Sequence, residues 1–152
     1  MFTSFHPLTT PCVTDYITIH GRTCLNTSAG APVSLDAIAM VKESASIPVV
    51  GNGDIFTLQH ARTMEERTHV DGVMSARGLL QNPLLFTGAD RPSVGVLKDM
   101  IEFASTYTLS YKLLHNHMMM MSFPLLGKSD RQIMTVCNSY SMLWDVCNQL
   151  FL

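Results

Sequence analysis

The side chains of this sequence that are best suited to binding a ligand lie in three short clusters of polar and glycine residues. The clusters are His20-Gly21-Arg22, Asn52-Gly53-Asp54 and Ser75-Ala76-Arg77-Gly78. Glycine lets a ligand approach the backbone closely, and free N–H groups at the start of a following helix can hold a phosphate. Arg77 would add a charge-assisted contact to the same anion. Any one cluster could be an ordinary turn, but the three together predict a ligand site that includes a phosphate.

Each cluster lies at the end of a short apolar segment that we predict to be a β-strand. The predicted strands cover residues 15–19, 47–51 and 71–75. They are mostly apolar rather than strictly alternating, as expected for strands that are covered on both faces. Two helices are predicted between them, one capped by Ser34 and one that runs from Thr57 to about Glu66, because Ser and Thr are favoured helix caps.

The order strand–helix–strand–helix–strand predicts an α/β fold with parallel strands and right-handed crossovers. His20 and Asn52 are 32 residues apart, and Asn52 and Arg77 are 25 apart. A (β/α)8 barrel of ~250 residues averages about 31 residues per unit, so the spacing predicts about three βα units of such a barrel. Chemistry in barrels and other parallel sheets lies where the strands end, which is where the three clusters are.

The pattern beyond Pro92 is helical only. Apolar residues recur at helical spacing in three segments, which are residues 97–108, 113–121 and 133–150. The run Met118–Met121 would fan around a helix, which favours core packing over a soft-metal site. We therefore predict an all-helical tail.

Composition limits the class of protein. The chain has 152 residues, of which 47% are hydrophobic and 14% charged, with a formal net charge of −2. So much apolar surface must be buried somewhere, which excludes a disordered chain, and the charge excludes a strongly basic nucleic-acid binder. No window approaches ~18 apolar residues, and the start does not resemble a secretory signal. We expect an intracellular, cytoplasmic protein with no membrane contact; nothing indicates its oligomeric state.

The cysteines and histidines do not predict a metal site. The chain has four cysteines and no C-x-x-C pair. Cys137 and Cys147 are ten residues apart, and on a shared helix they would point to different faces. His115 and His117 are two apart, so they do not share a face either. We expect the cysteines to be small buried hydrophobes in a reducing compartment.

In order and spacing, the segments around the three clusters resemble the tRNA-dihydrouridine synthases. The resemblance is carried by Ile17-Thr18-Ile19-His20-Gly21-Arg22-Thr23, Ile47-Pro48-Val49-Val50-Gly51-Asn52-Gly53-Asp54-Ile55, Asp71-Gly72-Val73-Met74-Ser75-Ala76-Arg77-Gly78 and Asn82-Pro83-Leu84-Leu85-Phe86. It is strongest to the eukaryotic synthase-4-like (20a/20b) branch. It covers residues 13–90 strongly and the helical tail more loosely.

The resemblance implies a TIM barrel that carries FMN, followed by a C-terminal helical domain that helps to bind tRNA. Residues 1–12 would then be an irregular leader, 13–90 part of the barrel and 91–152 the helical domain. In the family, FMN reduced by NADPH or NADH delivers hydride to a uridine of the tRNA D-loop, and a cysteine protonates the neighbouring carbon. The same activity is therefore expected here.

The resemblance also implies roles for individual residues. Arg22 is similar to the arginine that faces the substrate RNA. The flavin-contacting residues that the resemblance implies are His20, Asn52, Gly53, Asp54, Ala76, Arg77 and Gly78, the last three forming the turn that holds the phosphate.

The sequence departs from the family at the loop that carries the acid cysteine. Neither Cys12 nor Cys24 lies in a matching motif, so no catalytic residue is assigned. We expect a truncated form of a longer enzyme. The alternative is a non-catalytic tRNA-binding or interaction module derived from such an enzyme. A third reading, a phosphate-binding barrel similar to dihydroorotate dehydrogenase, fits the His-Gly-Arg-Thr run and the helical tail less well.

Overall fold

The computed structural model describes residues 14–23 and 31–151, and it divides into two compact units. The first unit contains residues up to Asn52 together with Met64–Met74, and the second contains Gly53–Thr63 and the chain from Ser75 onward. The leader expected over residues 1–12, together with Cys12 and Cys24, lies outside the described residues. Each unit is described by itself below.

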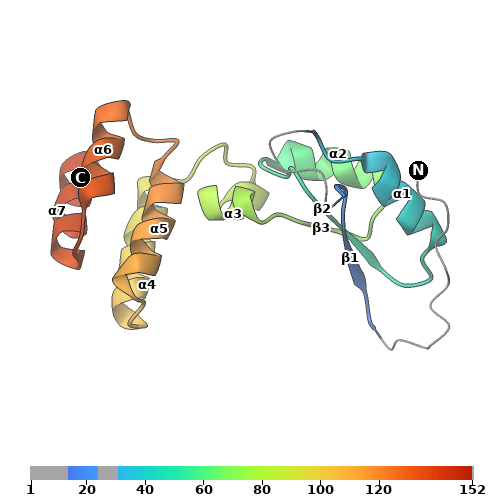
Figure 1. Ribbon diagram of the computed structural model, residues 1–152, viewed down its shortest axis with the longest axis horizontal. Coiled ribbons are helices and arrows are strands. Elements are labelled where there is room, and N and C mark those ends of the chain that lie inside the picture. The colour runs from blue at the N-terminus through green and yellow to red at the C-terminus, as the bar shows by residue number, and fades with distance from the viewer. Residues whose placement is uncertain (1–13, 24–30, 152) are drawn as a thin grey trace. The chain divides into compact units, whose positions relative to one another are not determined.

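The first unit is built on a small parallel sheet, as predicted (Figure 1). Its strands are β1 (Ile17–His20), β2 (Val49–Asn52) and β3 (Gly72–Met74), in the order β1-β2-β3. β1 pairs with β2 and β2 with β3, both in parallel. The observed and predicted strands differ by one or two residues at their ends, where pairing rather than apolar content decides the boundary.

Helices cover one face of this sheet. The intervening helices are α1 (Leu35–Ser44) and α2 (Leu58–Thr68), and Ile38 of α1 is fully buried. A Cβ on Gly51 would lie 2.6 Å from the Met64 sulfur of α2, so glycine there lets the helix approach the sheet. The prediction that the strands are covered on both faces is wrong for β1, whose residues alternate between half-buried and exposed. Within the first unit, the helices pack against only one face.

Side chains begin both helices as predicted. Ser34 Oγ accepts the N–H of Ala37 at 3.1 Å, and Thr57 Oγ1 accepts the N–H of His60 at 3.1 Å. Such bonds satisfy N–H groups that the first helical turn leaves without partners.

One carboxylate ties α1 to the sheet. Asp71 Oδ2 accepts Lys42 Nζ at 2.6 Å and the backbone N–H of Val49 at 2.7 Å. These two contacts join α1, the start of β2 and the residue just before β3. The hydrogen bond from Lys42, followed by that from Val49, lowers the pKa of Asp71 below its ordinary value of 3.8.

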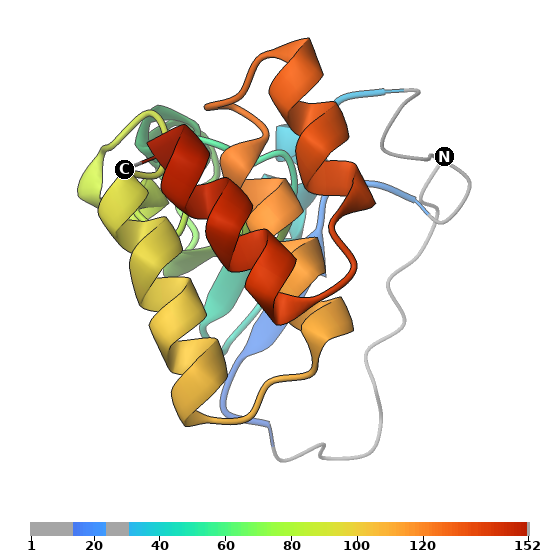
Figure 2. The same cartoon turned by 90° about the vertical axis from the view of Figure 1, so that its left-hand side faces the viewer.

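The second unit is helical where it has regular structure, as predicted for the tail. Besides the first part of α2, it contains a short helix α3, a 3-10 turn η1 and four longer helices (Figure 2). Their bounds are α3 (Arg77–Gln81), η1 (Leu85–Thr87), α4 (Val94–Thr106), α5 (Tyr111–Ser122), α6 (Lys128–Val136) and α7 (Tyr140–Phe151). The sequence did not predict α3 or η1, because five and three residues are too few to show a repeating apolar pattern.

The apolar run over residues 133–150 is divided between two helices rather than forming one. α6 ends at Val136 and α7 begins at Tyr140. Ser139 Oγ accepts the N–H of Met142 at 3.3 Å, so a serine cap starts a new helix where the apolar spacing alone suggested continuity.

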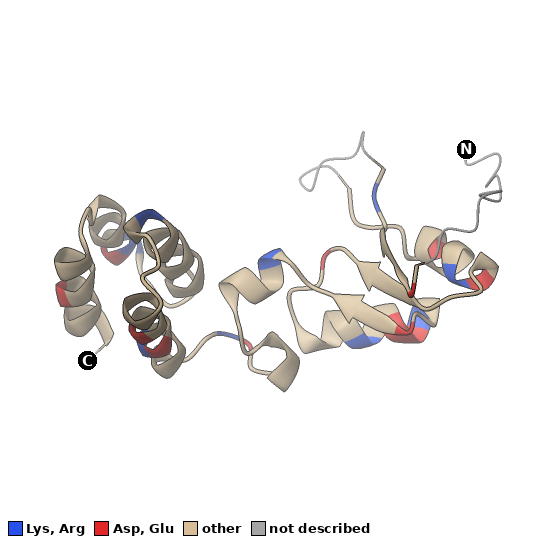
Figure 3. Cartoon of the chain, turned by 90° about the horizontal axis from the view of Figure 1, so that it is seen from below, with Lys and Arg blue, Asp and Glu red and all other residues tan. Residues whose placement is uncertain are grey.

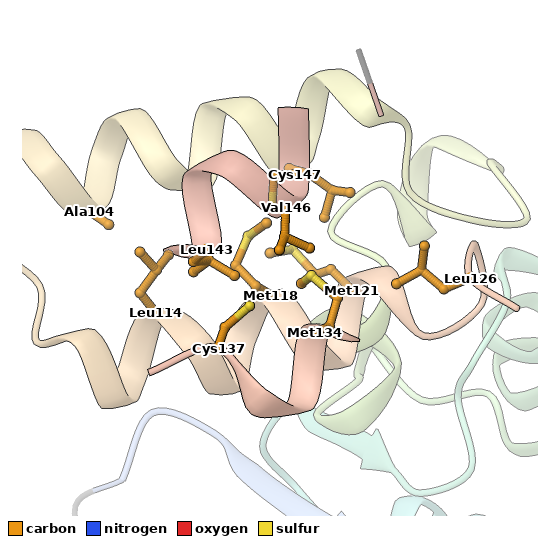
Figure 4. Close-up of a cluster of buried hydrophobic side chains, with 11 residues drawn as sticks. Ala104, Leu114, Met118, Met121, Leu126, Met134, Cys137, Leu143, Val146 and Cys147 are labelled. Carbon is orange, nitrogen blue, oxygen red and sulfur yellow. The ribbon is translucent and has the colours of Figure 1, made fainter. Parts of the chain in front are cut away.

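Side chains from all four longer helices form the core of the second unit, as Figure 4 shows for ten labelled residues. Leu114, Met118, Met134 and Leu143 are almost completely buried. Within the methionine run, Met118 and Met121 are buried while Met120 is 43% exposed. The run therefore fans around α5, and its buried members serve core packing as predicted.

Cys137 and Cys147 are free and buried, as expected of small core residues. The prediction that they face different directions is wrong, because its premise of one shared helix is wrong. Cys137 follows α6, Cys147 lies on α7, and both belong to the same core (Figure 4). Burial raises the pKa of both thiols, that of Cys147 to about 11.

Two negative findings apply to the described residues alone. None of their helices is both long and apolar enough to cross a membrane. Nor do they contain a group of three or more His, Cys, Asp or Glu side chains that could hold a metal ion.

Candidate flavin and RNA contacts

Three side chains line up across the carboxyl end of the sheet in the first unit. His20 is the register partner of Asn52, and Asn52 is the partner of Met74. Register partners on adjacent parallel strands project from the same face, and this is the face that α1 and α2 leave uncovered. Asn52 Nδ2 donates to the Met74 sulfur at 3.5 Å. We call His20, Asn52 and Met74 the strand-end group.

Local hydrogen bonds hold the segment that follows β1. The His20 ring accepts the backbone N–H of Arg22 at Nδ1, 3.1 Å away, which leaves Nε2 to carry the proton of the neutral ring. The Arg22 side chain donates from Nε to the carbonyl oxygen of Ala31 at 2.7 Å. A Cβ on Gly21 would lie 3.0 Å from Ser34 and Val33 atoms, so the backbone packs tightly here. Arg22 is thus anchored at Nε.

The second unit contains a loop and a turn that pack against each other. The loop is Gly53–Thr57 and the turn is Ser75–Gly78. Ser75 Oγ donates to the Ile55 carbonyl at 2.7 Å. A Cβ on Gly78 would lie 2.2 Å from the same carbonyl oxygen and 2.6 Å from Ser75 Oγ. Only glycine therefore allows the turn to lie this close to the loop.

The backbone of the loop takes an unusual path. Gly53 has φ 126° and Asp54 has φ 53°. Glycine adopts such positive values without steric cost, and Asp is among the few other residues that tolerate them. The Asn-Gly-Asp sequence therefore forms a sharp change of direction directly after β2.

Arg77 presents its guanidinium over this loop. One terminal nitrogen lies 3.8 Å from Asp54 Oδ1, and the guanidinium carbon lies 5.4 Å from the centre of the Phe56 ring. The Arg77 side chain remains 49% exposed. A planar, permanently charged fork held by a carboxylate and an aromatic ring, and still open to solvent, suits binding of a phosphate. We call Asp54, Phe56 and Arg77 the loop–turn group.

His60 contributes a contact to this loop that sequence reasoning missed. Its Nδ1 accepts the backbone N–H of Phe56 at 3.3 Å, whereas the sequence analysis gave this residue no role. The signal that could have found it is its position three residues after the Thr57 cap. At that position a side chain can reach back to an N–H before the helix.

The predicted contact residues therefore fall into two sets. His20, Arg22 and Asn52 lie in the first unit, and His20 and Asn52 are register partners at one sheet end. The second unit holds the predicted residues of the loop and the turn, which are Gly53, Asp54, Ala76, Arg77 and Gly78. Blue Lys and Arg segments and red Asp and Glu segments both occur on the helices of each unit (Figure 3).

Comparison with known proteins places these residues in a family context. Residues 12–144 match the profile of the dihydrouridine synthase (Dus) family. A mouse protein named tRNA-dihydrouridine(20a/20b) synthase (NAD(P)+)-like is 35% identical over 131 residues, which are 86% of this chain and 40% of that protein. The fission yeast tRNA-dihydrouridine(20a/20b) synthase is 38% identical over 117 residues, 77% of this chain and 36% of that one.

A bacterial relative matches a shorter stretch. The tRNA-dihydrouridine synthase B of Pasteurella multocida is 41% identical over 75 residues, which are 49% of this chain and 22% of that protein. The chain spans about two-fifths of the length of the mouse relative that it matches. The family match extends over both the strand-end group and the loop–turn group, and the chain therefore belongs to the dihydrouridine synthase family.

Proposed function

We propose that this chain acts in the reduction of uridine to dihydrouridine in the D-loop of tRNA, with FMN as cofactor and NADPH or NADH as reductant. The observation that carries the proposal is the family match across residues 12–144. That stretch includes both sets of candidate contact residues. The names of the relatives, which are tRNA-dihydrouridine synthases, support tRNA as the substrate.

In this proposal, residues 13–90 are part of a TIM barrel and residues 91–152 form a helical domain. Parallel β1, β2 and β3, joined through α1 and α2, are what successive units of such a barrel contain. The candidate polar residues follow the carboxyl ends of the strands, where barrels carry out their chemistry. The helices from α4 onward form the helical domain of this proposal.

The loop–turn group fits the phosphate end of FMN. Arg77 would bind the phosphate oxygens, while Asp54 and Phe56 restrict the orientation of its guanidinium. Gly53, Ala76 and Gly78 keep side-chain bulk away from the backbone of the loop and the turn. A half-exposed guanidinium beside a glycine-rich backbone can donate charge-assisted hydrogen bonds to the oxygens of a phosphate monoester.

The strand-end group fits the flavin itself. His20 and Asn52 offer an N–H and an amide on the open face of the sheet, suited to polar atoms on the rim of a flavin. When bound, FMN supplies the hydride that reduces the uridine. His20 and Asn52 would orient the flavin.

A proton donor is absent from this assignment. Among the described residues, both cysteines are buried in the core of the second unit with raised pKa values. A thiol must reach the substrate to protonate it, so neither can serve. This burial favours a second candidate function, in which the chain supplies flavin and tRNA contacts without completing the reaction itself.

One assay separates these functions and tests Arg22, proposed to face the substrate RNA. The chain is incubated with FMN, NADPH and an unmodified tRNA transcript, and dihydrouridine and bound tRNA are both measured. Dihydrouridine above the protein-free control supports the enzyme; tRNA binding without product supports the binding module.

Arg22→Ala should weaken tRNA binding about two- to tenfold, as loss of a phosphate contact does. Arg62→Ala, an exposed arginine on α2, is the matched control. Equal losses in the two variants would refute the role of Arg22.

A further inference from the structure

His60 lies next to the residues that hold the Arg77 side chain. Its Nδ1 accepts the backbone N–H of Phe56 at 3.3 Å. The Phe56 ring, in turn, lies 5.4 Å from the Arg77 guanidinium carbon. All three residues belong to the second unit. A chain of contacts therefore leads from an imidazole to the backbone of Phe56, and from the Phe56 ring to the guanidinium.

We infer that His60 is a positioning residue for Arg77, acting through Phe56 to aim the guanidinium at the flavin phosphate. The inference rests on the proposed role of Arg77 in binding FMN. Arginine has many rotamers, and a half-exposed one keeps a single orientation only where neighbours restrict it. Arg77 has two such neighbours on this loop: Asp54, whose Oδ1 lies 3.8 Å from a terminal nitrogen, and the Phe56 ring. Anything that fixes Phe56 therefore fixes one of the two restraints on Arg77.

A hydrogen bond to the Phe56 N–H is an effective way to fix this ring. Phe56 lies in a loop, where no helix or strand ladder holds its backbone. The bond from its N–H to His60 ties the loop to the first turn of α2, whose start is secured by Thr57. Without that acceptor, the backbone of Phe56 loses its own hydrogen bond, and its ring has more freedom to leave the guanidinium.

Helix capping is the competing explanation for the same contacts. His60 is the third residue of α2 and reaches back before the helix, as in a capping box, although the N–H that it accepts belongs to Phe56 rather than to the cap residue Thr57. A residue that only caps the helix would affect the stability of α2, and any change in flavin binding would be the same for FMN and for riboflavin. A residue that positions Arg77 would affect the phosphate contact, which riboflavin does not have.

The experiment compares dissociation constants for FMN and riboflavin, measured by flavin fluorescence, in four chains. His60→Ala should reduce the preference for FMN about two- to fivefold, the range of an exposed cation–π contact. His60→Asn should restore the preference, because its Oδ1 takes the place of Nδ1 as acceptor. Thr57→Ala, which removes the helix cap but leaves the Phe56 bond, should leave the preference unchanged. An unchanged preference in His60→Ala, or an Asn variant no better than Ala, would overturn the inference.

A second measurement keeps the inference separate from the proposed function. If the wild-type chain does not prefer FMN over riboflavin, the proposed phosphate role of Arg77 is wrong. The position of Arg77 is then read from the upfield ring-current shift of its side-chain protons by NMR without flavin. The shift should be present in wild type and His60→Asn, and lost in His60→Ala and Phe56→Leu. A shift that persists in His60→Ala would show that His60 does not position Arg77.

Discussion

Arg77 combines a permanent charge, exposure to solvent and two restraining neighbours, which is the combination that anion recognition requires. A terminal nitrogen of the guanidinium lies 3.8 Å from Asp54 Oδ1, and the guanidinium carbon lies 5.4 Å from the centre of the Phe56 ring. An exposed ion pair of this kind adds little to stability. Its value here is orientation, because a fork held in one plane can meet two phosphate oxygens at once.

Replacing Arg77 by Ala should weaken FMN binding about ten- to a hundredfold, the usual worth of hydrogen bonds to a charged group. Riboflavin, which has no phosphate, should bind wild type and variant equally well. Isothermal or fluorescence titration of both ligands provides the comparison. If the variant loses both ligands to the same extent, the fold has changed and Arg77 has no specific role.

At the residue scale, the sequence predicted which side chains to consider but not how they are held. Arg77 stands in a motif that glycines and spacing mark clearly. Its contacts with Asp54 and Phe56 depend on positive φ values at Gly53 and Asp54, which no periodicity encodes. His60 was missed because a histidine at the third position of a helix has no strong signature by itself.

At the scale of elements, α1 is joined to the sheet by one acidic residue rather than by packing alone. Asp71 receives hydrogen bonds from both Lys42 and the Val49 backbone, which lower its pKa. A carboxyl whose pKa is lowered by folding stabilises the folded state above its ordinary pKa. That contribution disappears as the pH falls through the lowered value.

Asp71→Asn should therefore lower the melting temperature at pH 7, and the difference from wild type should shrink as the pH falls below 3.8, the ordinary value. Thermal unfolding followed by circular dichroism between pH 2.5 and 7 checks this. Asp36→Asn is the matched control, because Asp36 is 93% exposed and its Arg67 partner is 3.5 Å away, so it should change little. A difference at pH 7 that persists unchanged at pH 2.5 would refute the role of the Asp71 charge.

Replacing Gly78 by Ala tests how closely the turn packs against the loop. Gly78→Ala should destabilise the chain by about 1–3 kcal/mol, as overpacking does, since the new Cβ would lie 2.2 Å from a backbone oxygen. Gly95→Ala in α4 is the control, because its Cβ would lie 3.5 Å from Ser93 Oγ, an ordinary van der Waals contact. It should stabilise by about 0.5–1 kcal/mol. Urea unfolding of both variants gives the change in the free energy of unfolding for each. Equal changes in the two variants would contradict the close packing of the turn against the loop.

Elements were predictable where local signals agreed. The three strands and the caps at Ser34 and Thr57 follow from β-branched segments and from Ser and Thr before apolar periodicity. The break between α6 and α7 was missed because apolar spacing continues across it. The capping bond of Ser139 outweighs that continuity. Whether a helix continues is decided by which backbone bonds are satisfied, and the apolar pattern does not report them.

At the scale of the whole molecule, the two units use different kinds of stabilisation. The first relies on a parallel sheet with helices on one face, and its other face carries polar side chains at the strand ends. The second buries methionine, leucine and cysteine side chains among α4, α5, α6 and α7. The spacing of apolar residues along the sequence predicted the fold class of each unit, a parallel sheet with helices for the first and helices alone for the tail. The meeting of Cys137 and Cys147 in one core was not, because it depends on how two helices fold back on each other.

The most direct test of the proposed function is an equilibrium titration of the folded 152-residue chain with FMN, with folding checked by circular dichroism. The proposal predicts saturable binding of one FMN per chain, and weaker binding of riboflavin because it cannot contact Arg77. A chain that is folded and shows no saturable response to FMN would contradict the claim that these strand ends and this loop form flavin contacts.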